Sequence, residues 1–276
     1  MRLNRFLASA GLGSRRGVEK MIVEGHVTVN GEPCLDLATT VLPSDSVKVD
    51  GRLVKAEPMC YLLLNKPKGF LCTADDEKDR RTIFDLLPDG FPRLFNVGRL
   101  DKESEGLLIL TNDGELAQFL THPSHGVEKE YEVILDQPFD SAKREKLLRG
   151  FHIEGGRAKM EGLAQLGPQK LKVILKQGLK RQIRLMFYDL GYEVDQLTRI
   201  RIGPLKANHL PLGAWRMLTA REVESLRKEP KSKAAWKPAA ASPAPAKSTA
   251  NKGNRQAAKP PRKGRNFTTK ARRHEG

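Results

Sequence analysis

Apolar residues in the first 57 positions are spaced for two short helices followed by short strands. Four of them recur at i, i+3, i+4 and i+7, the spacing of one helix face: Leu3, Phe6, Leu7 and Ala10. Ser14 is placed to cap the start of a second helix and Gly25 to cap its end. Two dipeptides typical of tight hairpins follow, Asn30-Gly31 and Asp50-Gly51. The pattern predicts a small domain of a helix pair and short strands over residues 1–57.

Residues 58–228 combine short strands with a few helices. Continuous or alternating apolar runs predict strands at 61–64, 95–100, 107–110, 131–135, 171–175 and 198–202. In the last of these, Arg199 and Arg201 are expected on the face opposite Ile200 and Ile202. Helices are predicted at 115–120, at 183–190 and after a capping box formed by Thr219 and Glu222. There is no regular strand–helix–strand repeat, so the pattern predicts an α+β domain.

The positive charge of the chain is concentrated in residues 229–276. The whole chain of 276 residues has a formal net charge of +16, but this tail alone carries 13 Lys and Arg against 2 Glu. It contains no Leu, Ile or Val, so it is predicted to be a disordered basic tail. An electrostatic RNA tether is favoured over a solubilising extension, because solubilising tails are more often acidic. The remaining residues are nearly balanced, at about +5.

Several classes of protein are disfavoured by composition. No run approaches the roughly 20 apolar residues of a membrane helix, and the first ten residues lack the apolar core of a secretion signal. The three cysteines are odd in number and lack metal-ligand spacing, which disfavours a disulfide scaffold and a zinc site. Neither GxGxxG nor a P-loop occurs, which disfavours a nucleotide cofactor. We expect a cytoplasmic protein with no metal, no cofactor and no membrane partner.

The most polar segment between two apolar strands is 98–106. Asp101 lies there beside Arg99, where a carboxylate kept ionised could act as nucleophile or base. A solvated turn is the commoner reading of such residues taken alone. Other candidates are weaker. Glu103 and Glu105 lack the defined separation of a glycosidase pair, and His122 and His125 lack a third metal ligand.

Basic residues also cluster in the first 20 positions, opposed there only by Glu19. They fit either a phosphate-binding surface or an ordinary solvated helix face. Segments 2–8, 10–16 and 25–31 together resemble an S4 RNA-binding domain, which contacts structured RNA through its second helix and the following loop. The resemblance implies RNA contacts from Arg2, Arg5, Ser14, Arg15, Arg16, Lys20 and Asn30.

The second part resembles the RsuA-type ribosomal pseudouridine synthases. The resemblance rests on Asn-Val-Gly-Arg-Leu-Asp at 96–101 with its continuation 104–114, and on the segments 64–69, 128–131, 181–184 and 197–203. With the S4-like part it covers about residues 1–228 in the order of the family. One departure is Gln177, where the family more often has an acidic residue. The fold implied for residues 58–228 is a mixed, largely antiparallel sheet.

The resemblance also implies roles for individual residues. Asp101 would be the catalytic carboxylate, Tyr131 would lie against the flipped uracil, and Arg184 would pair with Asp101. Arg99 would orient the loop or a phosphate. Further RNA contacts are implied for Lys66, Lys68, Arg181, Arg199 and Arg201.

The function implied is isomerisation of a uridine to pseudouridine in ribosomal RNA, in a structured stem-loop of a pre-ribosomal particle. We expect a monomer that acts on 23S rather than 16S rRNA. The alternative is a non-catalytic S4-type RNA-binding or ribosome-assembly protein. The Asp101 segment joined to the Tyr131 and Arg184 motifs favours the enzyme, because a binding platform would not require them.

Overall fold

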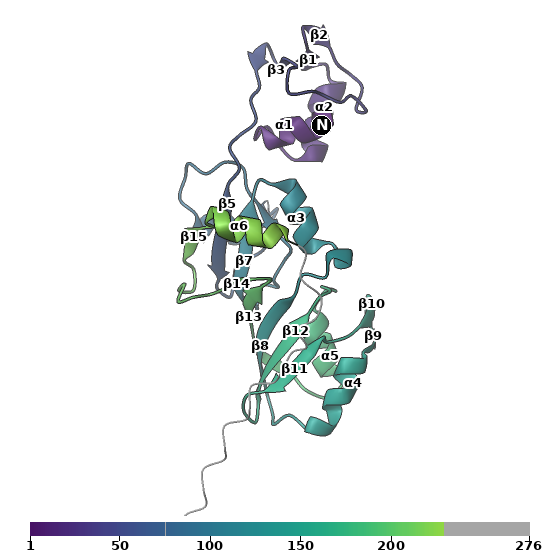
Figure 1. Ribbon diagram of the computed structural model, residues 1–276, viewed down its shortest axis with the longest axis vertical. Helices are drawn as coiled ribbons and strands as arrows, with labels where there is room; N and C mark the ends of the chain where they lie inside the picture. Colours follow the sequence, from purple (N-terminus) through teal and green to yellow (C-terminus); the bar gives the residue numbers. More distant parts are fainter. Residues whose placement is uncertain (75, 229–276) are drawn as a thin grey trace, which may run out of the picture. The chain divides into compact units, whose positions relative to one another are not determined.

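The computed structural model describes residues 1–74 and 76–228. The predicted tail, residues 229–276, lies outside the described part of the chain. Within that part, no helix is both long and apolar enough to cross a membrane. The α+β class expected from the sequence is confirmed, with an N-terminal helix-and-strand module followed by a large mixed sheet (Figure 1).

The N-terminal module contains the predicted helix pair, α1 (Leu3–Ser9) and α2 (Arg15–Val23). The Ser14 hydroxyl accepts a hydrogen bond from the Gly17 amide at 3.0 Å, which confirms the predicted cap. Four short strands form one sheet in the order β2-β1-β3-β4: β1 (Val27–Val29), β2 (Glu32–Pro33), β3 (Val47–Val49) and β4 (Arg52–Leu53). Leu3, Leu7, Val18 and Ile22 are fully buried between the helices and this sheet, so the apolar spacing is that of a core.

The second part is built on a nine-stranded sheet with the main order β11-β12-β8-β13-β7-β5-β15. Its neighbours are antiparallel except for β7 and β13, which run parallel, and two strands lie off the main path. The strands are β5 (Tyr61–Lys66), β6 (Phe95–Val97), β7 (Glu105–Thr111), β8 (Lys129–Leu135), β11 (Gly162–Gln165), β12 (Lys170–Leu175), β13 (Val194–Ile202), β14 (Leu205–Lys206) and β15 (Trp215–Met217). A separate hairpin pairs β9 (Phe151–Ile153) with β10 (Gly156–Ala158).

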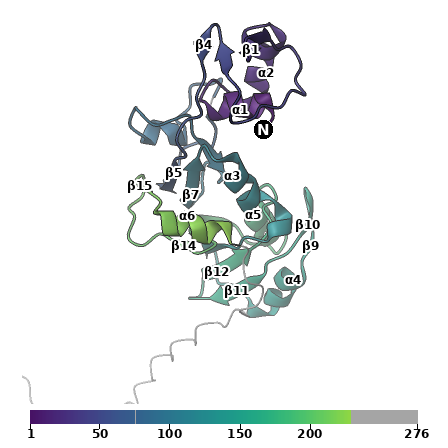
Figure 2. The same ribbon diagram turned by 45° about the horizontal axis from the view of Figure 1, so that its top comes forward.

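Helices cover the two halves of this sheet separately. They are α3 (Gly114–Thr121), α4 (Arg144–Arg149), α5 (Gln182–Tyr188) and α6 (Ala220–Arg227), with 3₁₀ turns at Ile83–Leu86, Pro123–His125 and Ser141–Lys143. The predicted Thr219–Glu222 capping box starts α6. Helices α3 and α6 pack on the β5–β7 half, whereas α4 and α5 pack on the half containing β8, β11 and β12 (Figures 1 and 2). Each pair of helices thus covers its own apolar core, and a third apolar cluster on β5 and β7 contains Leu62, Leu64 and Leu108.

The halves of the sheet meet where β7 runs beside β13. Only two residue pairs form this parallel junction, Thr198 with Glu105 and Arg199 with Gly106. Gly106 has φ +107°, and a Cβ built on it would lie 2.2 Å from the carbonyl oxygen of Arg199. A side chain at this position would therefore push the two backbones apart. Glycine is required where the halves join.

Gly106→Ala is expected to lower the free energy of unfolding by about 3 kcal/mol or more, because it adds a backbone clash to an unfavourable φ. Gly90→Ala is the matched control: Gly90 has φ +99° but nothing within 4 Å of a built Cβ. It should cost only about 1 kcal/mol. Denaturant unfolding of both variants measures the difference, and equal losses would show that no close contact exists at the junction.

The predicted alternation along the strand 198–202 is wrong. Irregularities in the pairing of β13 with β8 fall between Val194 and Gln196 and between Arg199 and Arg201. The second of these breaks the period of two. Arg199 consequently lies buried at 3% exposure, and its Nε donates to the carbonyl of Leu107 in β7 at 2.6 Å.

Candidate active site

Asp101 lies in the turn between β6 and β7, directly before the junction of the two sheet halves. Its side chain is half-buried. Its backbone carbonyl accepts a hydrogen bond from the Ser104 amide at 3.0 Å. Within residues 1–74 and 76–228, its carboxylate takes part in no hydrogen bond and no ion pair within 4.0 Å. The backbone of Asp101 is thus held by a hydrogen bond, whereas no side chain of the described residues binds its carboxylate.

Lys66, the last residue of β5, binds the backbone of this turn. Its side chain is completely buried. Its Nζ donates to four backbone carbonyls: Pro67 at 3.1 Å, Asp101 at 3.1 Å, Lys102 at 3.3 Å and Ser104 at 2.8 Å. Burial lowers the pKa of Lys66, while the thiol of Cys72 and the carboxylate of Asp101 act in the opposite direction. This buried ammonium group donates only to backbone carbonyls and thereby fixes the backbone of the turn.

Three further contacts hold the turn from other sides. The Gly69 amide donates to the carbonyl of Lys102 at 2.9 Å. The Leu100 amide contacts the Sγ of Cys72 at 3.4 Å, and Nη2 of Arg184 donates to the carbonyl of Glu103 at 3.4 Å. The Asp101 turn is therefore anchored to β5, to the segment after it and to α5. Such anchoring is what a catalytic group needs to keep its geometry.

Arg184 lies near Asp101, but the predicted ion pair between them is not formed. Nη1 of Arg184 instead donates to the carbonyl of Val194 at 2.6 Å. Burial is the main cause that lowers the pKa of Arg184, the charge of Arg181 adds to it, and the carboxylates of Asp101 and Glu103 oppose it. The two side chains thus interact through space. The reason for the missing pair is that backbone carbonyls of β13 and of the turn occupy the guanidinium.

Tyr131 completes this group from β8. Its side chain is buried at 8% exposure, in the same apolar cluster as Leu100, the residue before Asp101, and Ile183 of α5. Its neighbours across the sheet are Val173 and Arg199. The structure therefore places Tyr131 in the same apolar cluster as Leu100 and Ile183, the residues that precede Asp101 and Arg184 in the chain. Arg99 is exposed at the edge of the turn.

Unsatisfied polar atoms gather around the same turn. In the described part of the chain, four buried side-chain atoms lack a hydrogen-bond partner, and three belong here: Ser104 Oγ, Arg184 Nε and Arg199 Nη2. Buried polar atoms without partners are rare in folded proteins and call for an explanation. The turn is thus the region of the described chain where the fold leaves most of its unpaired buried polar atoms.

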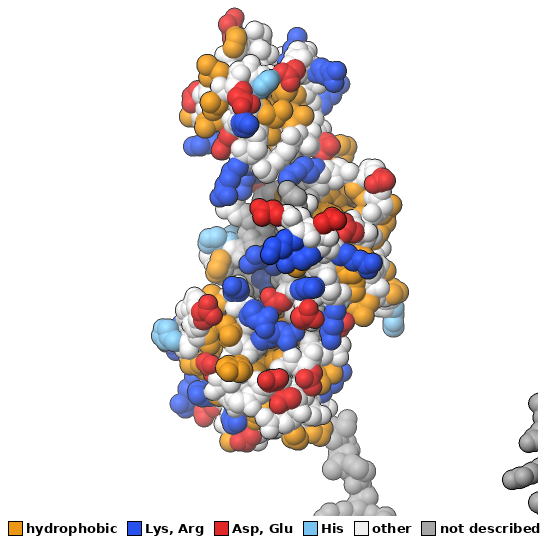
Figure 3. All heavy atoms as spheres, turned by 180° about the vertical axis from the view of Figure 1, so that it is seen from behind, with side chains coloured by type: hydrophobic (Ala, Val, Ile, Leu, Met, Phe, Trp, Pro, Cys, Tyr) orange, Lys and Arg blue, Asp and Glu red, His pale blue; other side chains and the backbone are white. Residues whose placement is uncertain are grey.

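Most predicted RNA-binding side chains of the N-terminal module are at its surface. Arg2, Ser14, Arg15, Arg16, Lys20 and Asn30 are exposed. Arg5 is half-buried and forms an ion pair with Glu115 at 2.7 Å, and the amide of Asn30 donates to Asp45 at 3.0 Å. In Figure 3 basic side chains gather in the middle of the face, with acidic ones between them. This matches the small net charge of residues 1–228.

Three of the side chains predicted to contact RNA in the second part are bound within the protein in this structure. Lys66 and Arg199 are buried, at 0% and 3% exposure, and bind backbone carbonyls. Arg201 is taken up by ion pairs with Glu130 at 2.8 Å and Glu128 at 3.0 Å, which link β13 to β8. Lys68 and Arg181 are exposed. The structural roles of Lys66, Cys72 and Gly106 were missed, because no local pattern reveals which strand a residue will meet.

Lys129, two residues before Tyr131, allows a test of side-chain burial in the protein interior. Burial lowers its pKa to about 8, and the charge of Arg199 adds to this effect. Its ordinary pKa is 10.5, so the unfolded chain binds this proton more tightly than the folded one. Stability should therefore rise with pH between about 8 and 10.5.

Lys129→Met should flatten that rise in a series of thermal unfolding curves taken across this pH window. Lys206→Met, at an exposed position in β14, should follow the wild-type curve. A slope that is unchanged in Lys129→Met would contradict the burial of this ammonium.

Comparison with known proteins supports both parts of the chain. Residues 1–47 match the family model of the S4 domain, and residues 60–189 match that of the RNA pseudouridylate synthases. A solved structure described as a pseudouridylate synthase matches with a TM-score of 0.61 at 29% identity, covering 82% of this chain and 99% of the other.

Curated relatives match over most of their length. An uncharacterised RNA pseudouridine synthase of Aquifex aeolicus (strain VF5) is 39% identical, covering 83% of this chain and 94% of the relative. The ribosomal large subunit pseudouridine synthase B of Bacillus subtilis (strain 168) is 37% identical, covering 82% and 95%. The dual-specificity RNA pseudouridine synthase RluF of Escherichia coli (strain K12) is 36% identical, covering 100% and 98%.

Proposed function

The chain belongs to the family of RNA pseudouridine synthases with an N-terminal S4 domain, and from this premise we propose that it isomerises a uridine of ribosomal RNA with Asp101 as the catalytic carboxylate. The observation that supports Asp101 is its state in the fold. Its backbone is fixed by the Ser104 amide and the Lys66 ammonium, while its carboxylate has no partner among the described residues. Glu105 differs in this respect, because it accepts from Gln196 at 3.0 Å. Glu103 also has no partner among the described residues, but it is exposed, whereas Asp101 is half-buried.

The reaction exchanges one bond of uridine for another. The bond between C1′ of the ribose and N1 of uracil breaks, uracil turns, and a bond forms between C1′ and C5. The proton on C5 goes to solvent, N1 gains a proton, and no electron is transferred. An ionised carboxylate at the ribose serves both possible routes, either by attacking C1′ or by removing a ribose proton to give a glycal.

The substrate base must leave its stack to reach Asp101, because a half-buried carboxylate cannot approach a base inside a helix. Tyr131 supports this step, since its ring lies in the apolar cluster that also contains Leu100. Stacking of a base on such a ring contributes roughly 1–3 kcal/mol. Arg184 would place positive charge beside the reacting carboxylate and offer its unpartnered Nε to the substrate.

We further propose 23S rRNA as the substrate, recognised as a stem-loop in a pre-ribosomal particle by a cytoplasmic monomer. Two relatives are named for the ribosomal large subunit, from Pseudomonas aeruginosa and Bacillus subtilis. Carbodiimide modification followed by primer extension locates pseudouridine in rRNA. In a strain that lacks the gene, a stop should disappear from 23S rRNA and return on complementation. Loss of a stop in 16S rRNA alone would overturn this substrate.

A further inference from the structure

A hollow of about 370 Å³ lies beside α5, next to Arg184 but apart from Asp101. It is lined by Arg181, Arg184, Leu185, Tyr188, Tyr192, Glu193 and Val194. Arg184 links it to the active site, because its Nη2 donates to the carbonyl of Glu103, two residues after Asp101. The hollow is therefore a surface space beside the Asp101 turn to which RNA on either side of the target nucleotide could extend.

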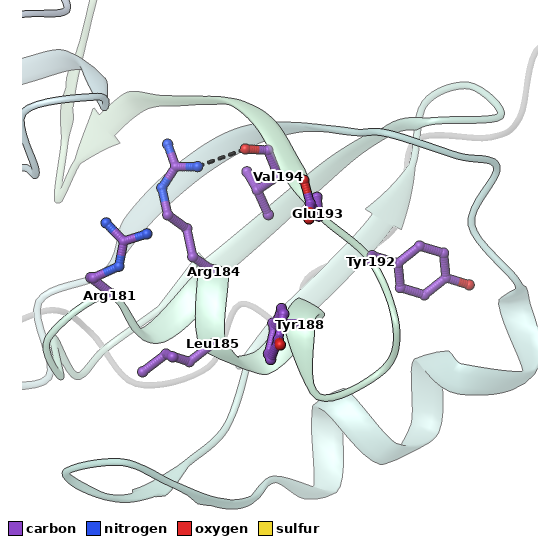
Figure 4. A pocket seen from close by; sticks show the side chains of 7 residues that line it. All are labelled: Arg181, Arg184, Leu185, Tyr188, Tyr192, Glu193 and Val194. Carbon is purple, nitrogen blue, oxygen red and sulfur yellow. Dashed lines mark hydrogen bonds between the residues drawn. The ribbon is translucent and has the colours of Figure 1, made fainter.

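Two guanidinium groups line one side of this hollow without a carboxylate partner. In the described part of the chain, neither Arg181 nor Arg184 has an ion pair within 4.0 Å, and the Arg181 side chain has no hydrogen bond. Figure 4 shows both side chains extending in the same direction, away from Glu193 and Tyr192. Their charges are close enough for Arg181 to lower the pKa of Arg184. Two like charges held together in this way favour an anion between or above them.

An aromatic ring lies on the same face of α5. Tyr188 follows Arg184 by one helical turn, and residues i and i+4 are neighbours on a helix surface. The Tyr188 side chain is 69% exposed. No other tyrosine in residues 1–74 and 76–228 is exposed. Tyr192, by contrast, is buried, with its hydroxyl accepting from the Asp140 amide at 3.0 Å. The Tyr188 ring is available to a ligand and not used by the fold.

We propose that this hollow holds a nucleotide adjacent to the target uridine, with its phosphate against Arg181 and its base stacked on Tyr188. A phosphate fits the Arg181 side because Glu193 lies at the other end of the hollow and would repel it (Figure 4). A planar base fits Tyr188, since cations beside an exposed ring form the usual surface for single-stranded nucleic acid. This subsite rests on the proposed function and adds a second point at which the strand is held.

The test compares Tyr188→Ala and Tyr188→Phe in steady-state kinetics on an unmodified 23S rRNA transcript. The alanine variant is expected to raise KM about tenfold with kcat within about twofold, because base stacking contributes roughly 1–3 kcal/mol. The phenylalanine variant keeps the ring and should keep the wild-type KM. Leu212→Ala removes another exposed apolar side chain, 54% exposed and outside the hollow, and should leave both constants unchanged.

The phosphate half of the proposal has its own measurement. Binding of the same transcript is measured with Asp101→Asn protein, with and without the additional substitution Arg181→Ala. Adding Arg181→Ala should weaken binding and reduce the slope of log affinity against log salt concentration by about one. A KM of Tyr188→Ala equal to wild type would overturn the stacking site, as would equal impairment in Tyr188→Phe. An unchanged salt dependence in Arg181→Ala would overturn the phosphate site. Absence of activity in wild-type protein would instead contradict the proposed function.

Discussion

Replacing Asp101 by asparagine is expected to slow pseudouridine formation at least about 10³-fold, because the amide can neither attack the ribose nor accept its proton. The substitution changes one oxygen for nitrogen and hardly changes volume. The carboxylate of Asp101 has no partner among the described residues, whereas its backbone carbonyl, which Lys66 binds, is untouched. The turn should therefore keep its conformation. Single-turnover reactions on an unmodified 23S transcript, digested to nucleosides and separated by chromatography, measure the rate.

Binding must be measured with the same protein to interpret this loss. Asp101→Asn should bind the transcript at least as tightly as wild type, because removing a negative charge near Arg184 does not weaken attraction to phosphate. Glu103→Gln, two residues away and exposed, is the matched control for loss of a charge in the same turn. It should keep a rate within about threefold of wild type. A comparable fall in both variants would mean that charge in the turn, and not the Asp101 carboxylate itself, governs the rate.

Lys66→Met should reduce both stability and rate. Methionine fills a similar space but donates no hydrogen bond, so four backbone carbonyls lose their shared ammonium. We expect about 3 kcal/mol less free energy of unfolding, because unpartnered buried polar groups cost roughly 1–3 kcal/mol each and some can relax. The turn would then move. A displacement of about 1 Å lowers the rate about 10²-fold, even in protein that remains folded.

Lys68→Met is the control for the stability change, because Lys68 lies two residues away and is exposed. Its free energy of unfolding should stay within about 0.5 kcal/mol of wild type. The rate is measured well below the midpoint of unfolding, so that the fraction of folded protein does not limit it. If Lys66→Met loses stability but keeps the wild-type rate, the ammonium supports the fold without positioning Asp101.

Local patterns predicted many of the elements, but not α4 or the strands β9, β10 and β11, and not all contacts between elements. The helix starts at Ser14 and Thr219 depend on hydrogen bonds over three residues, and both were predicted correctly. The buried state of Lys66 depends on carbonyls 35 to 38 residues away in the chain. A lysine before Pro67 at the end of a strand is normally taken for a surface residue. Nothing near it in the sequence indicates the turn that it will hold.

The arginines of β13 show the same limit in another form. Alternation places Arg199 and Arg201 on one face, and a single irregularity in pairing with β8 separates them. Arg199 then meets β7, which lies more than 90 residues earlier in the chain. Asp101, Tyr131 and Arg184 were proposed together as site residues because the resemblance supplied them. Composition alone would have left Asp101 as one loop carboxylate among many.

The distribution of charge along the chain also bears on how RNA binding and chemistry are divided. A net charge of +16 would fit a general RNA-binding surface, yet residues 1–228 are nearly neutral and ion pairs such as Arg201 with Glu130 are internal. Electrostatic attraction then serves association with RNA. In the proposed function, the chemistry depends on the Asp101 carboxylate beside Arg184 and Tyr131.

Release of tritium from uracil C5 tests the role of Asp101 most directly, because the C5 proton is lost only when the glycosidic bond is exchanged. Wild-type and Asp101→Asn protein would each be incubated with unmodified 23S rRNA labelled with tritium at C5. The account predicts release by the wild type and essentially none by the variant, although both bind the RNA. Equal release by the two proteins would contradict it.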